Sequence, residues 1–347
     1  LAFMFSDSFW FSAVEAEVYA LSSLFTAFVV WAMLRWEAEK DEQYADRWLL
    51  LIAYCMGLSI GVHLLNLVTI PALALIYYFK KFKGEVKATK LIITVAISFV
   101  ILGGILVGVI PGLPSVAAKF EILFVNSFGL PFGSGIIFFC ALFIGGLVYG
   151  VLYSIKKANY VLNISLLGFI FVLIGYCTYG IIVIRSNYNP PIDENNPENI
   201  LSFVSYLKRE QYGDRPFLYG PLFTAEVIKQ EKGDPVYIKT DKGYEIVDYK
   251  IENTYDPKHE ILFPRIYSNR GDHLEAYKNW VKIPANGKRP SFWTNIEFYV
   301  KCQLGFFYWR YFLWNFVGRE SDIQDAGVLW GFDDKKNLPI ALATNKA

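Results

Sequence analysis

The chain has 347 residues, of which 54% are hydrophobic and 18% aromatic, and 33 basic against 32 acidic side chains give a formal net charge of +1. This balance says nothing about a charged partner, and the basic and aromatic residues form no nucleic-acid-binding motif. No glycine-rich phosphate loop is present, which disfavours a nucleotide-dependent cytosolic enzyme.

Apolar and basic residues divide the chain into two parts. Nearly all long apolar runs precede Arg185, whereas 22 of the 33 basic residues lie from Arg185 onward. We therefore expect a mainly α protein, with a polytopic membrane helical bundle of about six helices in residues 1–185 and an external mixed α/β domain in residues 186–347. The chain starts at Leu1 inside an apolar run without a charged leader, so we expect a fragment.

The cysteine and histidine residues give no metal signature. His259 and His273 lack metal-ligand spacing, and the cysteines neither pair into a disulfide framework nor show Cys/His metal spacing. Neither a metal site nor a bound cofactor is predicted. The cysteines are Cys55, Cys140, Cys177 and Cys302.

The first predicted membrane helix starts near Phe9 and carries two glutamates. Its polar residues recur every three or four positions and form one stripe, which should face protein or water. Glu17 lies about 200° around the helix from Glu15, so the two carboxylates should not form a catalytic dyad unless the first turn is irregular. The stripe consists of Ser8, Ser12, Glu15, Tyr19, Ser22 and Thr26.

The second apolar run, residues 48–79, is too long for one ordinary span. Its 32 residues would form a helix of about 48 Å, whereas the hydrocarbon core is about 30 Å thick. Basic residues flank both ends, which favours a helical hairpin with its apex near residues 57–66, on the outer side. Ordinary single spans are predicted at 9–34, 91–110, 134–153 and 160–184.

This topology separates the basic residues by side. Ten fall in the three inferred inner loops and only Lys119 falls in an outer loop, within residues 111–134. Everything after Arg185 is then external. For a bacterial chain, this arrangement predicts a multi-pass inner-membrane protein with a periplasmic C-terminal half. Three GxxxG pairs predict close helix packing: Gly57/Gly61, Gly104/Gly108 and Gly146/Gly150.

The external half contains three predicted elements. Residues 197–213 read as an amphipathic helix, and residues 235–251 as a hairpin around Asp241 to Gly243. The aromatic stretch near 295–317 predicts a helix lying at the membrane interface. Within it, Arg310 has two equally weighted interpretations, which are contact with a lipid phosphate or acceptor peptide and packing against the bundle.

The residues that can carry chemistry lie near the predicted outer boundary. His63 at the hairpin apex should border a common recess with Glu15 and Glu17, which could position a nucleophile, take up a proton or hold a phosphate. Alternatively, Glu17 and His63 only pair with each other or reach to the interface. Arg185, directly after the last span, is either an interfacial anchor or a cation for a lipid head group.

Five blocks of the sequence resemble, in the same order, the bacterial membrane-protein family catalogued as domain-of-unknown-function family 2723. That family is grouped with the C-type superfamily of glycosyltransferases and is similar to eukaryotic transmembrane protein O-mannosyltransferases. The blocks are "SDSFWFSAVEAEVYALSSLFTA", "GLSIGVHLLNLVTIPAL", "IRSNYNPPIDENNPEN", "LKREQYGDRPFLYGPLF" and "YWRYFLWNFVGRESDIQD".

The resemblance implies transfer of a sugar, mannose or similar, from a polyprenyl-phosphate donor in the membrane lipid to a hydroxyl of an exported protein. The sequence departs from the family's pattern in one respect. The acidic tryptophan-containing loop of such enzymes is not found here, so we expect the main catalytic carboxylate to precede Leu1. The family's closing membrane helices are likewise expected after Ala347.

Glu15, Glu17 and His63 are then supporting catalytic candidates, and Arg185, Asn187 and Arg310 are candidates for binding the donor phosphate or substrate. A transporter or a non-catalytic subunit of an envelope assembly is the alternative function.

Overall fold

The computed structural model describes residues 4–39, 44–82, 86–213, 215–284, 288–321, 323 and 326–329. The chain forms two compact units. The bundle unit comprises Glu17–Gly213 and Val236–Val247, and the C-terminal unit comprises Leu1–Ala16, Asp214–Pro235 and Asp248–Ala347. The predicted division at residue 185 concerns the two sides of a membrane and stays a prediction.

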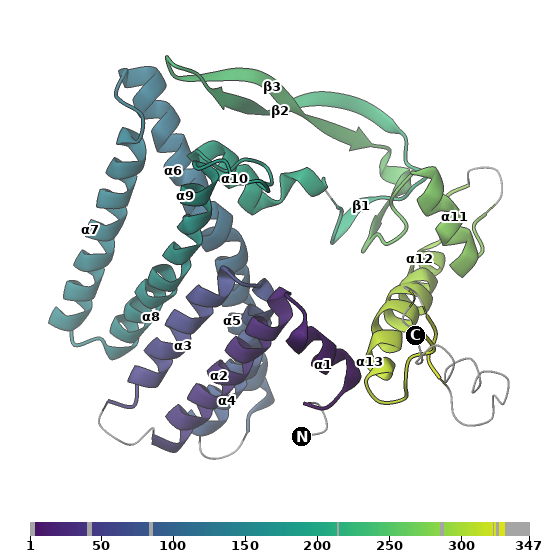
Figure 1. The fold of residues 1–347 in the computed structure, drawn as a ribbon, viewed down its shortest axis with the longest axis horizontal. Coiled ribbons are helices and arrows are strands. Elements are labelled where there is room, and N and C mark those ends of the chain that lie inside the picture. Colours follow the sequence, from purple (N-terminus) through teal and green to yellow (C-terminus); the bar gives the residue numbers. More distant parts are fainter. Residues whose placement is uncertain are drawn as a thin grey trace. The chain divides into compact units, whose positions relative to one another are not determined.

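The bundle unit consists of long apolar helices, which confirms the expected fold class (Figure 1). In the described part of the chain, five helical segments are long and apolar enough to cross a membrane, and a shorter apolar helix, α3, accompanies them. The five segments are α2 (Val18–Glu39), η1 with α4 (Leu64–Thr69, Ile70–Lys81), α5 to η3 (Ala88–Ser127), α7 (Ser134–Lys156) and α8 to α9 (Tyr160–Ser186); α3 is Arg47–Ile60.

The predicted first helix is interrupted. Helix α1 (Asp7–Val14) ends at Glu15, whose extended backbone (φ −74°, ψ 148°) closes it, and α2 begins only at Val18. The predicted polar stripe through Ser8, Ser12, Glu15 and Tyr19 is therefore wrong, because the two helices do not share one helical phase. Glu15 and Glu17 were predicted to lie apart only on a regular helix. The turn at Glu15 is irregular, so that condition is not met.

The predicted hairpin in residues 48–79 is confirmed. The chain leaves helical geometry at Gly61 to His63, between α3 and η1. The two ends of the hairpin opposite its apex both lie beside the C-terminal end of α2. Trp48 donates to Glu39 at 2.8 Å, and Tyr77 stacks on Trp36 with ring centroids 5.2 Å apart. The two helices therefore run in opposite directions.

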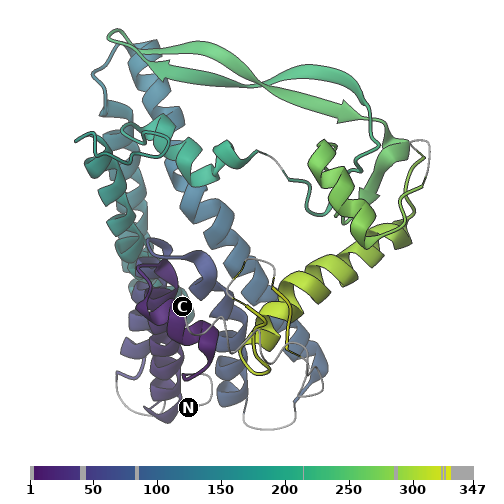
Figure 2. The ribbon, with the colours of Figure 1, turned by 45° about the vertical axis from the view of Figure 1, so that its right-hand side comes forward.

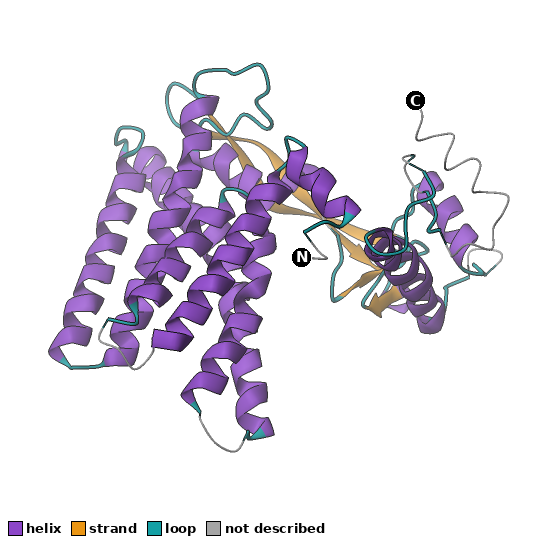
Figure 3. Ribbon diagram, turned by 60° about the horizontal axis from the view of Figure 1, so that its bottom comes forward, coloured by secondary structure: helices purple, strands orange, loops and turns teal. Residues whose placement is uncertain are grey.

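The ends of the bundle helices that flank the predicted inner loops gather at one end of the unit (Figures 1 and 3). Tyr160, at the start of α8, donates to Asp46, just before α3, at 2.6 Å, and Tyr78 in α4 donates to the Lys87 carbonyl at 3.4 Å. Lys40 and Lys83, two of the predicted inner basic residues, lie outside the described residues. The positions of the described helix ends agree with the prediction that the basic inner loops all lie on one side of the membrane.

Single cysteines at Ala38, Leu65 and Val86 give a direct test of this topology. In sealed vesicles, we expect a membrane-impermeant maleimide to label positions 38 and 86 from one side and position 65 from the other. All three side chains are exposed in the structure. Labelling of positions 38 and 86 from opposite sides would contradict the hairpin.

The predicted external loop at residues 111–134 is largely wrong. After α5 (Ala88–Gly103), helix continues through η2 (Gly104–Gly112), α6 (Leu113–Ile122) and η3 (Leu123–Ser127). The π-helical geometry of η2 accommodates Pro111, which has no backbone N–H to donate. At about 1.5 Å per residue, the 40-residue helix is about 60 Å long and exceeds the hydrocarbon thickness.

The GxxxG pairs differ in packing. A Cβ on Gly57 would overlap the Val172 carbonyl oxygen, and one on Gly175 would lie 2.6 Å from the Leu58 nitrogen, so α3 and α8 cross at backbone contact. By contrast, a Cβ on Gly104, Gly108 or Gly146 would meet no atom within 4 Å. The predicted close packing is confirmed at Gly57 and at Gly150, where a Cβ would lie 3.2 Å from the Leu166 side chain, and Gly61 is in ordinary contact with Tyr179. It is wrong at Gly104, Gly108 and Gly146.

Short strands and helices build the C-terminal unit. Strands β1 (Tyr219–Pro221) and β4 (Glu260–Leu262) pair antiparallel, with Tyr219 opposite Leu262. The buried Asn295 side chain accepts from the backbone N–H groups of Arg265 and Ile266 and donates to the Phe263 carbonyl. The core consists of Leu222, Ile261, Ile266, Tyr277, Val281, Phe298 and Cys302.

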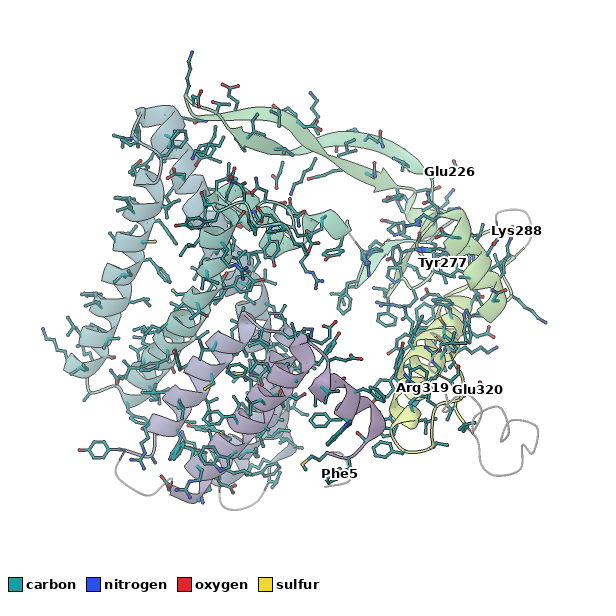
Figure 4. All side chains as sticks on the ribbon, viewed as in Figure 1. Phe5, Glu226, Tyr277, Lys288, Arg319 and Glu320 are labelled. Atoms are coloured by element: carbon teal, nitrogen blue, oxygen red, sulfur yellow. The ribbon has the colours of Figure 1, made fainter. Side chains whose placement is uncertain are left out.

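The helices of this unit are α11 (Gly271–Trp280) and a continuous helix formed by α12 (Phe292–Phe298), η7 (Tyr299–Trp309) and α13 (Arg310–Trp314). Figure 4 labels Tyr277 on α11 and Arg319 shortly after α13. The helix predicted from the aromatic stretch is confirmed, while its position at a membrane interface stays a prediction.

The remaining elements follow the sequence patterns. Helix α10 (Ile200–Lys208) begins with a capping box between Asn199 and Ser202, and η5 (Glu210–Tyr212) follows it. Strands β2 (Val227–Lys239) and β3 (Tyr244–Tyr255) form the predicted hairpin, seen as a twisted ribbon in Figure 2, and η6 (Pro257–His259) precedes β4.

Candidate functional site

His63 occupies the apex of the α3–α4 hairpin and caps η1. Its Nδ1 accepts the backbone N–H of Leu65 at 3.1 Å. A neutral imidazole whose Nδ1 accepts a hydrogen bond carries its proton on Nε2. The half-buried ring therefore presents Nε2–H as a donor. In this state His63 can donate a hydrogen bond to an oxyanion, whereas neither ring nitrogen is free to act as a base.

Tyr19 is the ring partner of His63. The ring centroids lie 5.5 Å apart with a 54° angle between the planes. This contact joins the first turn of α2 to the hairpin apex. Glu17 lies two residues before Tyr19 at the start of the bundle unit and is exposed; Glu15 is also exposed but belongs to the C-terminal unit. The structure thus brings His63 together with Tyr19.

A buried polar network supports the apex from below. Asn66 is fully buried, accepts from the Thr26 hydroxyl at 3.2 Å and donates to the Ser59 hydroxyl at 3.0 Å. Thr26 comes from α2 and Ser59 from α3, so one amide joins both helices to η1. A satisfied buried network of this kind fixes one arrangement of the helices. It therefore holds His63, three residues before Asn66, in a defined place.

Two of the predicted phosphate-binding residues lie in α9 and directly after it. Arg185 is exposed and lies in α9 (Ile181–Ser186). It follows Tyr179 of η4 (Thr178–Gly180) by six residues, which is about 9 Å along the helix. The Asn187 side chain donates to the carbonyls of Val183 and Glu198 at 2.8 and 3.0 Å. These contacts give Asn187 a structural role in joining α9 to the following loop.

Arg310 lies in the C-terminal unit and is only 4% exposed. Its guanidinium lies 3.7 Å from the Phe306 ring centroid and 5.1 Å from that of Trp314, and Nη1 donates to the Ala326 carbonyl at 3.4 Å. These contacts all lie within the C-terminal unit, so they show neither of its two interpretations, which stay predictions.

A cavity of about 310 Å³ lies in the bundle unit at the tip of the β2–β3 hairpin. Its walls are mainly apolar, and the ammonium of Lys239 lies 4.8 Å from the Phe132 ring centroid. Phe203 of α10 also lines it and packs against Tyr179 at 6.3 Å. The charged and aromatic lining residues are Glu121, Phe132, Glu198, Phe203, Lys239 and Tyr244.

The hairpin tip is fastened to the bundle at Tyr244. Asn126 accepts from the Tyr244 backbone N–H at 2.9 Å and donates to its carbonyl at 2.7 Å, and the Tyr244 hydroxyl donates to Glu121 at 3.4 Å. The Glu121 carboxylate also accepts the N–H groups of Gly133 and Gly135 at the start of α7, where the helix dipole favours a negative charge. This buried carboxylate orders the cavity wall.

We expect Tyr244 to titrate unusually late. Burial raises the pKa of Tyr244 to about 12, and the negative charge of Glu121 adds to the effect. An unfolded tyrosine has a pKa of about 10. The contribution to stability is therefore complete below pH 10 and is lost as the pH rises through 12, because the unfolded state ionises first.

Tyrosinate absorbance at 295 nm, recorded for the wild type and for Tyr244→Phe, isolates this group as a difference titration. A difference curve centred near pH 12 is the predicted result. A midpoint near pH 10 would show that the hydroxyl is not held against Glu121.

Comparison with known protein families places these sites in context. Residues 1–86 match the model described as the protein O-mannosyl-transferase TMEM260 N-terminal domain, and residues 213–300 match the model of a family of unknown function, DUF8416. No curated protein and no solved structure matches the chain. The first match contains α1, α2 and the hairpin, including Glu15, Glu17, Tyr19 and His63.

The N-terminal quarter of the chain is therefore similar to the N-terminal domain of a protein O-mannosyl-transferase. The fastening of Tyr244 to Asn126 and Glu121 was not expected from the sequence. Its partners are separated by 118 or more positions, and no local pattern signals such a contact.

Proposed function

We propose that this chain is part of a membrane glycosyltransferase that moves a sugar, mannose or similar, from a polyprenyl-phosphate donor to a hydroxyl of an exported protein. The match of residues 1–86 to the N-terminal domain of a protein O-mannosyltransferase carries the proposal. The finer resemblance to domain-of-unknown-function family 2723 supports a bacterial membrane enzyme. The basic residues at the other end of the bundle favour a hairpin apex and a C-terminal half that face the periplasm.

In this reaction, the acceptor oxygen bonds to the anomeric carbon while the bond from that carbon to the phosphate oxygen breaks. The phosphate leaves with negative charge, which a fixed hydrogen-bond donor stabilises. We assign this role to the Nε2–H of His63, because its Nδ1 is engaged with Leu65. Tyr19 holds the ring in place through their contact.

The acceptor hydroxyl must also be oriented and must lose its proton to a base. Glu17, exposed two residues before Tyr19, is our candidate for binding this hydroxyl. Glu15 is a second candidate for organising the acceptor. Arg185 remains a candidate cation for a lipid phosphate beyond the last span.

The test is a transfer assay with the full-length enzyme that contains this chain, in liposomes that contain radiolabelled mannosyl polyprenyl phosphate and a serine- or threonine-containing peptide. Labelled peptide supports the proposal, and its formation should fall in Glu17→Gln. Glu37→Gln, near the opposite end of α2, is the matched control and should retain full activity. Substrate flux without labelled peptide would instead establish the transporter alternative.

A further inference from the structure

The helix from Phe292 to Trp314 in the C-terminal unit has two different halves. In its first half, Phe298 and Cys302 belong to the buried core. Glu297 and Lys301 form an exposed ion pair at 2.6 Å on the same half. The first half is therefore packed on one side, and its exposed side carries this ion pair together with Phe292, Trp293 and Val300.

The second half presents aromatic side chains to the surface. Between residues 307 and 317, six of the seven exposed large apolar side chains are aromatic, and each of the six is 43–57% exposed. Four of the rings, Tyr308, Trp309, Phe312 and Phe316, contact one another, and at half exposure they present roughly 300–500 Å², which matches the largest apolar patch of a typical soluble monomer. This aromatic face consists of Phe307, Tyr308, Trp309, Tyr311, Phe312 and Phe316.

The aromatic face differs in composition from the surfaces of the bundle helices. On α5, five of the six exposed large apolar side chains are aliphatic, with Phe99 as the exception. Aliphatic side chains suit the hydrocarbon core, whereas tyrosine and tryptophan prefer the head-group level, where the ring is buried and its polar atom is hydrated. The aliphatic surface of α5 therefore suits the hydrocarbon core, and the aromatic face suits the head-group level.

We propose that the aromatic face docks into the head-group region of the same bilayer that the bundle helices cross. The chain itself carries the five apolar segments that tether it to that bilayer, so a lipid surface is always within reach. Glu297 and Lys301 keep the first half out of the hydrocarbon, so the helix lies along the interface rather than across the membrane. This proposal does not depend on the enzymatic function.

Depth-dependent quenching tests the proposal on the whole chain. In a background with all four cysteines replaced by alanine, Phe312→Cys carries an environment-sensitive nitrobenzoxadiazole label in phosphatidylcholine liposomes. Tyr308→Cys serves as a second position in case one substitution disturbs the helix. Asp272→Cys, exposed in α11 of the same unit, is the matched control.

We expect blue-shifted emission at positions 308 and 312, quenched more strongly by a doxyl group near the lipid head group than by one near the chain end. The label at position 272 should be quenched by neither. Absence of lipid quenching at both 308 and 312 would overturn the proposal, as would cross-linking of both positions to the bundle or to a second copy. Stronger quenching from the chain end would also overturn it, since the helix would then lie in the hydrocarbon.

Discussion

Replacing His63 with alanine should lower sugar transfer by about 100-fold or more, which is the usual cost of removing one fixed donor to a developing oxyanion. The variant also loses the side-chain cap of η1, at a cost of about 1 kcal/mol in stability. The measurement is the initial rate of peptide labelling at saturating donor, normalised to folded protein.

His63→Asp separates the two roles. Aspartate is a good N-cap and can accept the Leu65 N–H, but its ionised carboxylate has no N–H or O–H to donate to the leaving phosphate. We expect the aspartate variant to be as stable as the wild type and as inactive as the alanine variant. His273→Asp in α11 is the control and should leave transfer unchanged. Full transfer by His63→Asp would reduce His63 to a cap and remove it from the chemistry.

Replacing Gly57 with alanine should destabilise the bundle by about 1–3 kcal/mol, or more if the helices cannot separate. The added methyl group would overlap the Val172 carbonyl oxygen at the crossing of α3 and α8. Gly175→Ala should behave similarly, because its Cβ would lie 2.6 Å from the Leu58 nitrogen. The midpoint of thermal unfolding in detergent measures the effect.

Gly104→Ala and Gly146→Ala are the matched controls, because both glycines face open space on their helices. Each control should be neutral or slightly stabilising, since alanine favours a helix over glycine by up to about 1 kcal/mol. If all four variants lost equal stability, the α3–α8 crossing would be packed no more tightly than the surroundings of Gly104 and Gly146.

Local patterns in the sequence predict much of this fold. Apolar length and flanking basic residues are enough to predict the bundle and the hairpin in residues 48–79, because the bilayer imposes both. The β2–β3 hairpin follows from alternation around residues 241–243. The break at Glu15 was missed because apolar periodicity continues through it, while the backbone turns there.

The continuation of the helix from Gly104 to Ser127 was missed because the sequence suggests a break where the structure has none. Pro111 and Pro114 resemble loop signals, but a π-helical turn absorbs Pro111 and Pro114 lies in the first turn of α6. Of the candidate residues, His63 could be located from sequence because polar side chains are costly in a membrane span. Its partners Tyr19 and Asn66 could not, since their roles depend on how α2 packs against the hairpin.

The central claim is that sugar transfer takes place at the hairpin apex, on the side opposite the basic helix ends. The most direct measurement uses sealed vesicles of known orientation, labelled polyprenyl-phosphate sugar and a membrane-impermeant acceptor peptide. We predict that the peptide is labelled only on the side from which a cysteine at position 65 is modified. Labelling only from the side of positions 38 and 86, or from neither side, would contradict this account.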